Sequence, residues 1–452
     1  MKRRSRQVDD VEHHNYSDPD AVLPEKKCRR TQKLKSIFLL LAVVAVIAKT
    51  SSAWMSTTRT TAVRLSYAPP SNVTNQFLAT FEKVMSSPDL ILPGGFSAYV
   101  PLILEDRKLL CRGSHKDVLS KARSRAYIEM LNKGLDSSED LIDKDDSPSV
   151  PIILIESDES GCHNHIHLDQ VPFPRLTWHV PPPKYGTGWC QAISMTGYES
   201  WNSFRYMHSY HDTWFFDYTW DARFTNNERK YPWKSKIGKA IWRGSTTGRT
   251  RLEHNITFDE LSRAKLVKKS MDRPDIIDAA FTSFVQGWEV VLDEGHSNQT
   301  IVSRHVPFGA LMKYRAIIDI DGNSWSSRFT KLLCTNSVVI KIDPEYIEHF
   351  YADLEPMIHY VPASLENITE VAEYVLDNNN QDEMKAIVRS ANSWCKGFNT
   401  KEQLPKDAVS QLMKYETALM EAYNESGWDE DWRIVQRRIR ENIGEDLVDC
   451  NV

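Results

Sequence analysis

The chain has 452 residues, too many for one ordinary hydrophobic core, so its length predicts two or three domains. Residues 1–35 hold 10 Lys and Arg against 6 Asp and Glu (+4), whereas residues 55–452 hold 45 against 55 (−10). An acidic main part argues against a nucleic-acid-binding protein.

Residues 37–48 are all apolar, between a basic amino-terminal segment and Lys49. Twelve residues give only ~18 Å of helix, but Lys49 can snorkel and Trp54 can anchor an extended span. A buried helix fits the polar flanks poorly, and the long preceding segment disfavours a cleaved signal peptide. We predict a cytosolic tail over 1–35, a transmembrane signal-anchor over 36–54 and a stem over 55–75.

The composition beyond the anchor suits a lumenal, oxidising compartment. Five Asn-x-Ser/Thr sequons, which begin at Asn72, Asn255, Asn298, Asn367 and Asn424, lie there. Six of the seven cysteines also follow the anchor and permit three disulfides, whose pairing the sequence leaves open.

The next region, 76–235, is expected to form one α/β domain. Residues 77–85 and 116–131 have helical spacing, and 150–155 is a buried-strand pattern with Asp158 just beyond its carboxyl end. An aromatic segment follows at 201–220 and includes Tyr210, His211, Asp212 and Trp214. Such a segment is more often a core or a domain interface than a platform for a sugar or base.

The region 236–400 is expected to form a second α/β domain. A strand at 236–242 leads into a loop that begins Arg243-Gly244-Ser245-Thr246, and helices are predicted over 260–271 and 276–284. A second strand at 314–321, a polar loop at 322–327, a helix at 328–333 and a strand at 337–342 make a βαβ unit. Ser326 or Ser327 is placed to cap that helix, and the loop is suited to phosphate.

Further helices are predicted over 345–354, 369–376, 382–393, 409–423 and 431–442. The helices within 401–452 are expected to pack back on the two domains. Strands that alternate with helices in both halves predict an α/β architecture, with two domains that face a cleft.

Two arginines that each open a hydroxyl-rich loop, Arg243 and Arg328, would suit a diphosphate if both face one cleft. They would otherwise bridge surface carboxylates. Asp158 could accept a proton from an attacking hydroxyl, although a single Asp in such a place is more often structural. Asp319-Ile-Asp321 and the three histidines of 163–167 could hold a metal, but neither pattern is specific.

Several segments together resemble glycosyltransferase family 90, which includes the protein O-glucosyltransferases. The matching motifs are Tyr210-His-Asp212, Pro232-Trp-Lys234, Trp242-Arg-Gly-Ser245, Lys313-Tyr314, Ser326-Ser-Arg-Phe329, Glu348-His-Phe-Tyr351 and Ile358-His-Tyr-Val-Pro362.

The resemblance implies a GT-B fold, with a Rossmann-like acceptor-side domain over 76–235 and a Rossmann-like UDP-sugar-binding domain over 236–400. It also implies transfer of glucose or xylose from a UDP-sugar, with inversion and without an essential metal. It places the catalytic base at Asp158 and acceptor or sugar contacts at Tyr210, His211, Asp212 and Trp214. The implied donor-binding residues are Arg243, Gly244, Ser245, Thr246, Lys313, Asn323, Ser324, Trp325, Ser326, Ser327 and Arg328.

The resulting hypothesis is an inverting glycosyltransferase in the Golgi or endoplasmic reticulum membrane, single-pass type II, with its catalytic part in the lumen. Its partners would be a UDP-sugar, a glycoprotein or glycan acceptor and the membrane through 36–54, with no nucleic acid. Two alternatives stay open: a catalytically inactive carbohydrate-binding relative, and a metal-dependent GT-A transferase that uses Asp319 and Asp321.

Overall fold

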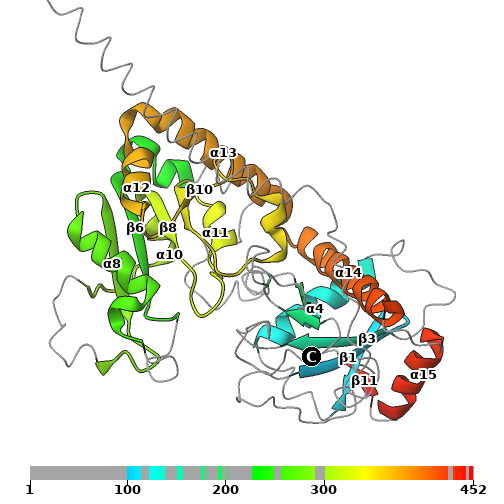
Figure 1. Cartoon of the computed structure of the whole chain (residues 1–452). Coiled ribbons are helices and arrows are strands. Elements are labelled where there is room, and N and C mark those ends of the chain that lie inside the picture. Colours follow the sequence, from blue (N-terminus) through cyan, green and yellow to red (C-terminus); the bar gives the residue numbers. More distant parts are fainter. Residues whose placement is uncertain are drawn as a thin grey trace, which may run out of the picture. The chain divides into compact units, whose positions relative to one another are not determined.

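The computed structural model describes residues 99–113, 122–137, 150–155, 175–177, 180, 192–195, 201, 227–248, 256–290, 301–425, 431–443 and 447–450. The chain divides into two compact units, Met1–Arg64 and Leu65–Val452, and every described residue belongs to the second. The described residues form an α/β fold built on two sheets (Figure 1).

The first sheet is mixed and has the strand order β11-β2-β1-β3-β4-β5. Neighbours from β11 to β3 pair antiparallel, whereas β3, β4 and β5 pair in parallel. The strands are β1 (Tyr99–Glu105), β2 (Lys108–Arg112), β3 (Val150–Ile155), β4 (Arg175–Thr177), β5 (Ala192–Ser194) and β11 (Leu447–Asp449).

Three helices belong to the core of this sheet: α4 (Ala122–Ser137), α14 (Gln403–Glu425) and α15 (Trp432–Ile443). Tyr127 of α4, Tyr415 of α14 and Val435 of α15 share one buried cluster with the strands. Figure 1 shows α14 beside α4, and the backbone at Gly134 explains the close approach, because an added Cβ would meet the Pro405 carbonyl oxygen. The carboxyl-terminal segment therefore completes a layer that begins near residue 99.

The second sheet is wholly parallel and has the order β10-β9-β8-β6-β7. Its strands are β6 (Ile237–Ser245), β7 (Ile277–Ser283), β8 (Tyr314–Asp319), β9 (Val338–Ile342) and β10 (Val361–Ala363). Ile318 faces one buried cluster and Ile317 the other, so both faces of the sheet are covered. Because both faces of the central strands are buried, their sequences are nearly continuous apolar runs.

Helices cover both faces. On one face, α8 (Ser262–Asp272) and α12 (Ile368–Leu376) pack with Trp242 and Phe281. On the other, α10 (Phe308–Leu311) and α11 (Phe329–Leu333) pack with Phe350, and α13 (Gln381–Phe398) contributes to both clusters. Short 3₁₀ helices lie at η5 (Trp233–Ser235), η6 (Phe258–Glu260), η7 (His349–Asp353) and η8 (Asn378–Asn380).

The predicted helix over 276–284 is wrong, because this segment forms β7. Ile277, Ala279 and Phe281 alternate into one buried cluster, which is the period of a strand. The β1–β2 hairpin was not expected, because its turn lacks glycine. Asp106 and Arg107 adopt the left-handed φ values of 48° and 63° instead.

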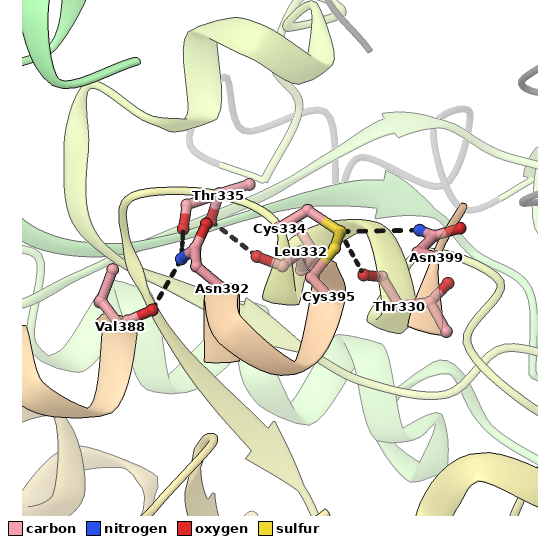
Figure 2. Close-up of a disulfide and its surroundings, with 8 residues drawn as sticks. All are labelled: Thr330, Leu332, Cys334, Thr335, Val388, Asn392, Cys395 and Asn399. Atoms are coloured by element: carbon pink, nitrogen blue, oxygen red, sulfur yellow. Dashed lines mark hydrogen bonds between the residues drawn. A yellow bond between two sulfur atoms is a disulfide. The ribbon is translucent and has the colours of Figure 1, made fainter. Parts of the chain in front are cut away.

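Of the three disulfides that six cysteines permit, the described residues contain one. Cys334, at the end of α11, is bonded to Cys395 of α13, 61 residues later (Figure 2). Next to it the Asn392 amide donates to the carbonyl oxygens of Thr335 and Val388, each at 2.7 Å. This bond joins the helix that follows the polar loop to the long helix covering the sheet.

Among the residues that the structure describes, no helix is both long and apolar enough to cross a bilayer. The predicted anchor, 36–54, lies outside those residues, as do the tail and the stem.

Candidate functional site

The second sheet has one point at which its connections turn in opposite directions. From β6 the chain moves to β7 on one side, whereas β8, β9 and β10 follow on the other. Loops at the carboxyl ends of β6 and β8 therefore separate, and ligands of open α/β sheets bind in the crevice at such a switch point. The predicted loop start at Arg243 is wrong, because Arg243, Gly244 and Ser245 lie within β6. The end of β6 and the Arg328 loop meet at this point.

The backbone opens there as well. The pairing of β6 with β8 ends at Ile241 and Ile317, although β6 stays paired with β7 as far as Ser245. A pocket of about 200 Å³ at this edge is lined in part by Thr247, Gly248 and Gly322.

Arg328, the N-cap of α11, reaches the end of β6, where its Nη1 donates to the backbone carbonyl of Arg243 at 2.6 Å. Burial lowers the pKa of Arg328, while the nearby Asp319 raises it. A partly buried guanidinium beside the carboxyl end of a parallel strand is suited to an anionic ligand.

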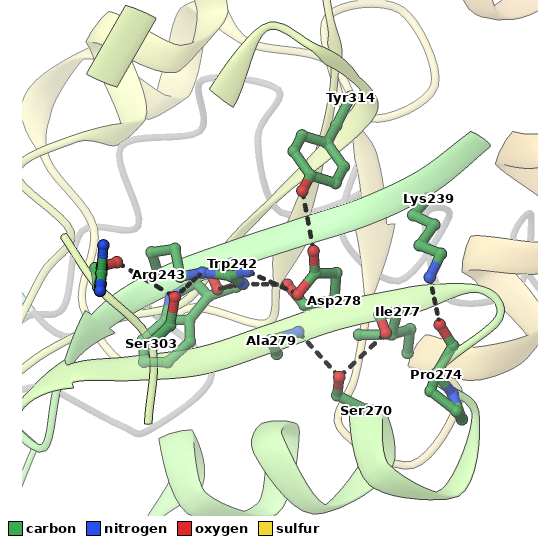
Figure 3. Close-up of polar contacts among 11 residues, drawn as sticks. Lys239, Trp242, Arg243, Ser270, Pro274, Ile277, Asp278, Ala279, Ser303 and Tyr314 are labelled. Carbon is green, nitrogen blue, oxygen red and sulfur yellow. Dashed lines mark hydrogen bonds and ion pairs between the residues drawn. The ribbon is translucent and has the colours of Figure 1, made fainter. Parts of the chain in front are cut away.

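The Arg243 guanidinium points elsewhere (Figure 3). Its Nη2 pairs with the Asp278 carboxylate at 2.6 Å, Nη1 donates to the Asp278 carbonyl at the same distance, and Nε donates to Ser303 at 3.2 Å. Tyr314 donates to the other Asp278 oxygen at 2.9 Å. Hence Arg243 and Arg328 come together, but through the Arg243 backbone rather than through two converging guanidinium groups.

The hydroxyls of the two loops have different surroundings. Thr246 is fully buried and bonds the backbone of Val285, while Ser326 donates to Asp319 at 2.5 Å. Asn323 and Ser327 are exposed, and Asn323 accepts from the Gly248 amide at 3.0 Å. Ser324 and Trp325 are buried.

The predicted cap and helix dipole are not supported by the geometry. Helix α11 has five residues, its N-cap is Arg328, and no side chain caps it. The Ser326 hydroxyl bonds Asp319 instead. Such a short helix has little macrodipole, so the loop would act on an anion mainly through side chains.

Asp319 and Asp321 share one ammonium. Lys341 Nζ lies 2.8 Å from Asp319 and 2.6 Å from Asp321, and the Lys341 side chain is 1% exposed. Burial alone would lower the pKa of Lys341, but the two carboxylates raise it well above its ordinary value. The pair suggested for a GT-A metal site is thus engaged in a buried ion-pair triad.

Arg263 of α8 bridges the two separated strand ends. Its Nη1 donates to the Ser245 carbonyl at 3.0 Å and also to the Thr247 hydroxyl. Its Nε donates to the Asp321 carbonyl at 2.9 Å and its Nη2 to the Ile320 carbonyl at 3.3 Å.

Lys313 precedes β8, at the end of that strand opposite the polar loop. Its backbone carbonyl accepts from Ile237 at 2.7 Å, and the structure does not place it with the other predicted donor-site residues. Asp158, Tyr210, His211, Asp212 and Trp214 lie outside the described residues, and Asp158 follows the end of β3 by three positions in the sequence.

Sequence reasoning missed Arg263 and Lys341, although a signal existed for each. Arg263 has the helical spacing of Leu266, Val267 and Ser270, which are all buried, so a charge stands on an apolar face. Lys341 interrupts an all-buried β9. A charged side chain that is buried in either place needs hydrogen-bond or ion-pair partners. Both positions could therefore have been predicted as buried polar contacts.

A parallel α/β sheet with cationic side chains at its switch point is suited to an anionic ligand. Residues 218–426 match the model described as Glycosyl transferase family 90. The resemblance predicted from the motifs is thus confirmed over this part of the chain.

Curated relatives agree with the family. The chain is 31% identical over 157 residues to zebrafish (Danio rerio) Protein O-glucosyltransferase 2, covering 34% of this chain and 28% of the relative. It is 25% identical over 216 residues to mouse (Mus musculus) Protein O-glucosyltransferase 1, covering 47% and 50%. The matches thus span no more than about half the length of these relatives.

Among solved structures, Anabaena HepE in complex with UDP and glucose is similar at a TM-score of 0.30 and 8% identity, covering 50% of this chain and 58% of HepE. The pneumococcal O-GlcNAc transferase GtfA is similar at a TM-score of 0.26 and 10% identity, covering 40% and 37%. Similarities of this size do not establish a shared fold.

Proposed function

We propose that this protein is a UDP-sugar-dependent glycosyltransferase of the GT-B type, which moves glucose or xylose to a hydroxyl of a protein or glycan. The observation that carries the proposal is the position of Arg328, at the switch point of a parallel sheet within the family-matched segment. The names of the relatives support glucose.

In the proposed reaction, an acceptor oxygen attacks the anomeric carbon while Asp158 takes its proton. The bond between that carbon and the β-phosphate oxygen breaks, and UDP leaves with the bonding electrons. Negative charge grows on the β-phosphate, and a guanidinium such as Arg328 is suited to stabilise it electrostatically. The Arg243 side chain would have to leave Asp278 to contribute directly, so its part in donor binding stays a prediction.

The proposed mechanism assigns the charge of the leaving UDP to cationic side chains, so no essential metal is proposed. The Cys334–Cys395 bond supports an oxidising, secretory compartment. The membrane anchor over 36–54 and residence in the Golgi or endoplasmic reticulum are further parts of the proposal.

The test is calorimetric titration of the full chain with UDP, followed by turnover of UDP-glucose and UDP-xylose to UDP. Losing one charge-assisted contact should weaken UDP binding roughly 10- to 150-fold in Arg328→Ala. The matched control is Arg315→Ala, since Arg315 lies at the start of β8 and bonds Asn378. Absence of UDP binding by the wild-type chain would refute the proposal, and unchanged affinity in Arg328→Ala would remove Arg328 from the site.

Asp158→Asn should retain UDP affinity and lose transfer, because its role is to accept the proton rather than to bind the donor. Equal loss of both would assign Asp158 to folding.

A further inference from the structure

The two loops at the switch point lie on strands that no longer pair with each other. Beyond Ile241 and Ile317 the β6–β8 ladder has ended, so carbonyl groups near these strand ends need other donors. The Ser245 carbonyl on one strand and the Ile320 and Asp321 carbonyls after the other find that donor in Arg263.

Arg263 is well fitted to this place. Its side chain comes from α8, the residue as a whole is 8% exposed, and its guanidinium lies over the Trp242 ring at 5.6 Å from the centroid. Burial, and then the charge of Arg328, lower its pKa to about 9, which leaves it cationic at neutral pH. Four of its five N–H donors have acceptors within the protein, so little of it remains for a substrate.

We propose that Arg263 is a positioning residue, which fixes the spacing of the loops after β6 and β8 and thereby places Arg328 for the nucleotide diphosphate. The inference rests on the proposed function. The Arg263 side chain packs closely against the backbone at Gly322, because a Cβ added there would lie 3.2 Å from Arg263 Nη2 and 3.3 Å from the Thr247 hydroxyl. A lysine could not reproduce it, since an ammonium lacks the planar fork that reaches both strand ends at once.

The test uses the full chain with Arg263→Met, Arg263→Lys and the matched control Arg315→Met. Hydrogen exchange of the amides at 245–248 and 320–328 reports loop order, and calorimetry reports UDP affinity. Arg263→Met should speed exchange in both loops and weaken UDP at least tenfold, while exchange in β9 stays unchanged. Arg263→Lys should recover part of each effect, and Arg315→Met should show neither.

A coupling measurement separates positioning from general loss of structure. If Arg263 acts through the loop that carries Arg328, the combined Arg263→Met and Arg328→Ala variant should lose less affinity than the product of the two single losses. The inference would be overturned if the affinity loss of the double variant equalled the product of the two single losses. Unchanged hydrogen exchange of the loops in Arg263→Met would overturn it as well.

Two other results are interpretable: a variant that does not fold, and a wild type that does not bind UDP. Should Arg263→Met fail to fold, Arg263→Lys decides by the same exchange and affinity measurements. Should the wild type bind no UDP, the proposed function fails. The diphosphate part of the inference then falls with it, while loop exchange still decides whether Arg263 fixes the spacing.

Discussion

Replacing Lys341 by methionine should destabilise the protein by about 3–5 kcal/mol, because it leaves two carboxylates without their shared cation. The Lys341 and Asp319 side chains are 1% and 0% exposed, and contacts at 2.8 and 2.6 Å are lost. At roughly 1.5–3 kcal/mol for each charged hydrogen bond, the two losses sum to about 3–6 kcal/mol. Each unpaired carboxylate can instead take up a proton, which costs about 4 kcal/mol at pH 7. This cost is the upper limit of the destabilisation that each carboxylate causes.

The assay is urea unfolding of wild type and variant between pH 7 and pH 4.5. In the variant the stranded carboxyls should bind protons more readily when folded than when unfolded, so its stability should rise, relative to wild type, as the pH falls. Lys385→Met is the control, because Lys385 pairs with Asp382 at the surface and its loss should not move the midpoint. A penalty below about 1 kcal/mol at pH 7, or one independent of pH, would refute the ion-pair reasoning.

Two other predictions concern the same domain. Cys395→Ser should lower stability by about 2–4 kcal/mol, since a 61-residue loop is no longer closed. In urea unfolding, dithiothreitol should destabilise the wild type more than the variant. Burial lowers the pKa of Lys236 to about 7, so the folded chain binds fewer protons than the unfolded chain above that pH. Stability should therefore rise from pH 7 to 9 by up to about 1.4 kcal/mol per pH unit, and Lys236→Met should reduce that slope; equal slopes would contradict the pKa.

The sequence predicted the parallel βαβ unit well, because a doubly covered strand leaves an apolar run that polar loops interrupt. It failed at β7, where seven residues are too few for helix and strand periods to be distinguished without the tertiary partner. The positions of the Arg243 and Arg328 loops followed from topology. The direction of the Arg243 guanidinium did not, because Asp278 and Tyr314, on neighbouring strands, determine it.

The route of the chain through the first sheet has a consequence for biosynthesis. Its edge strand β11 and the helix α14 are synthesised after the whole parallel sheet, whereas β1 and β2 emerge from the ribosome before that sheet. The parallel sheet from β6 to β10 is contiguous in sequence and can assemble first. The first sheet must wait for α14 and β11 to be synthesised before its core is complete, which makes that interval the one in which a chaperone matters most.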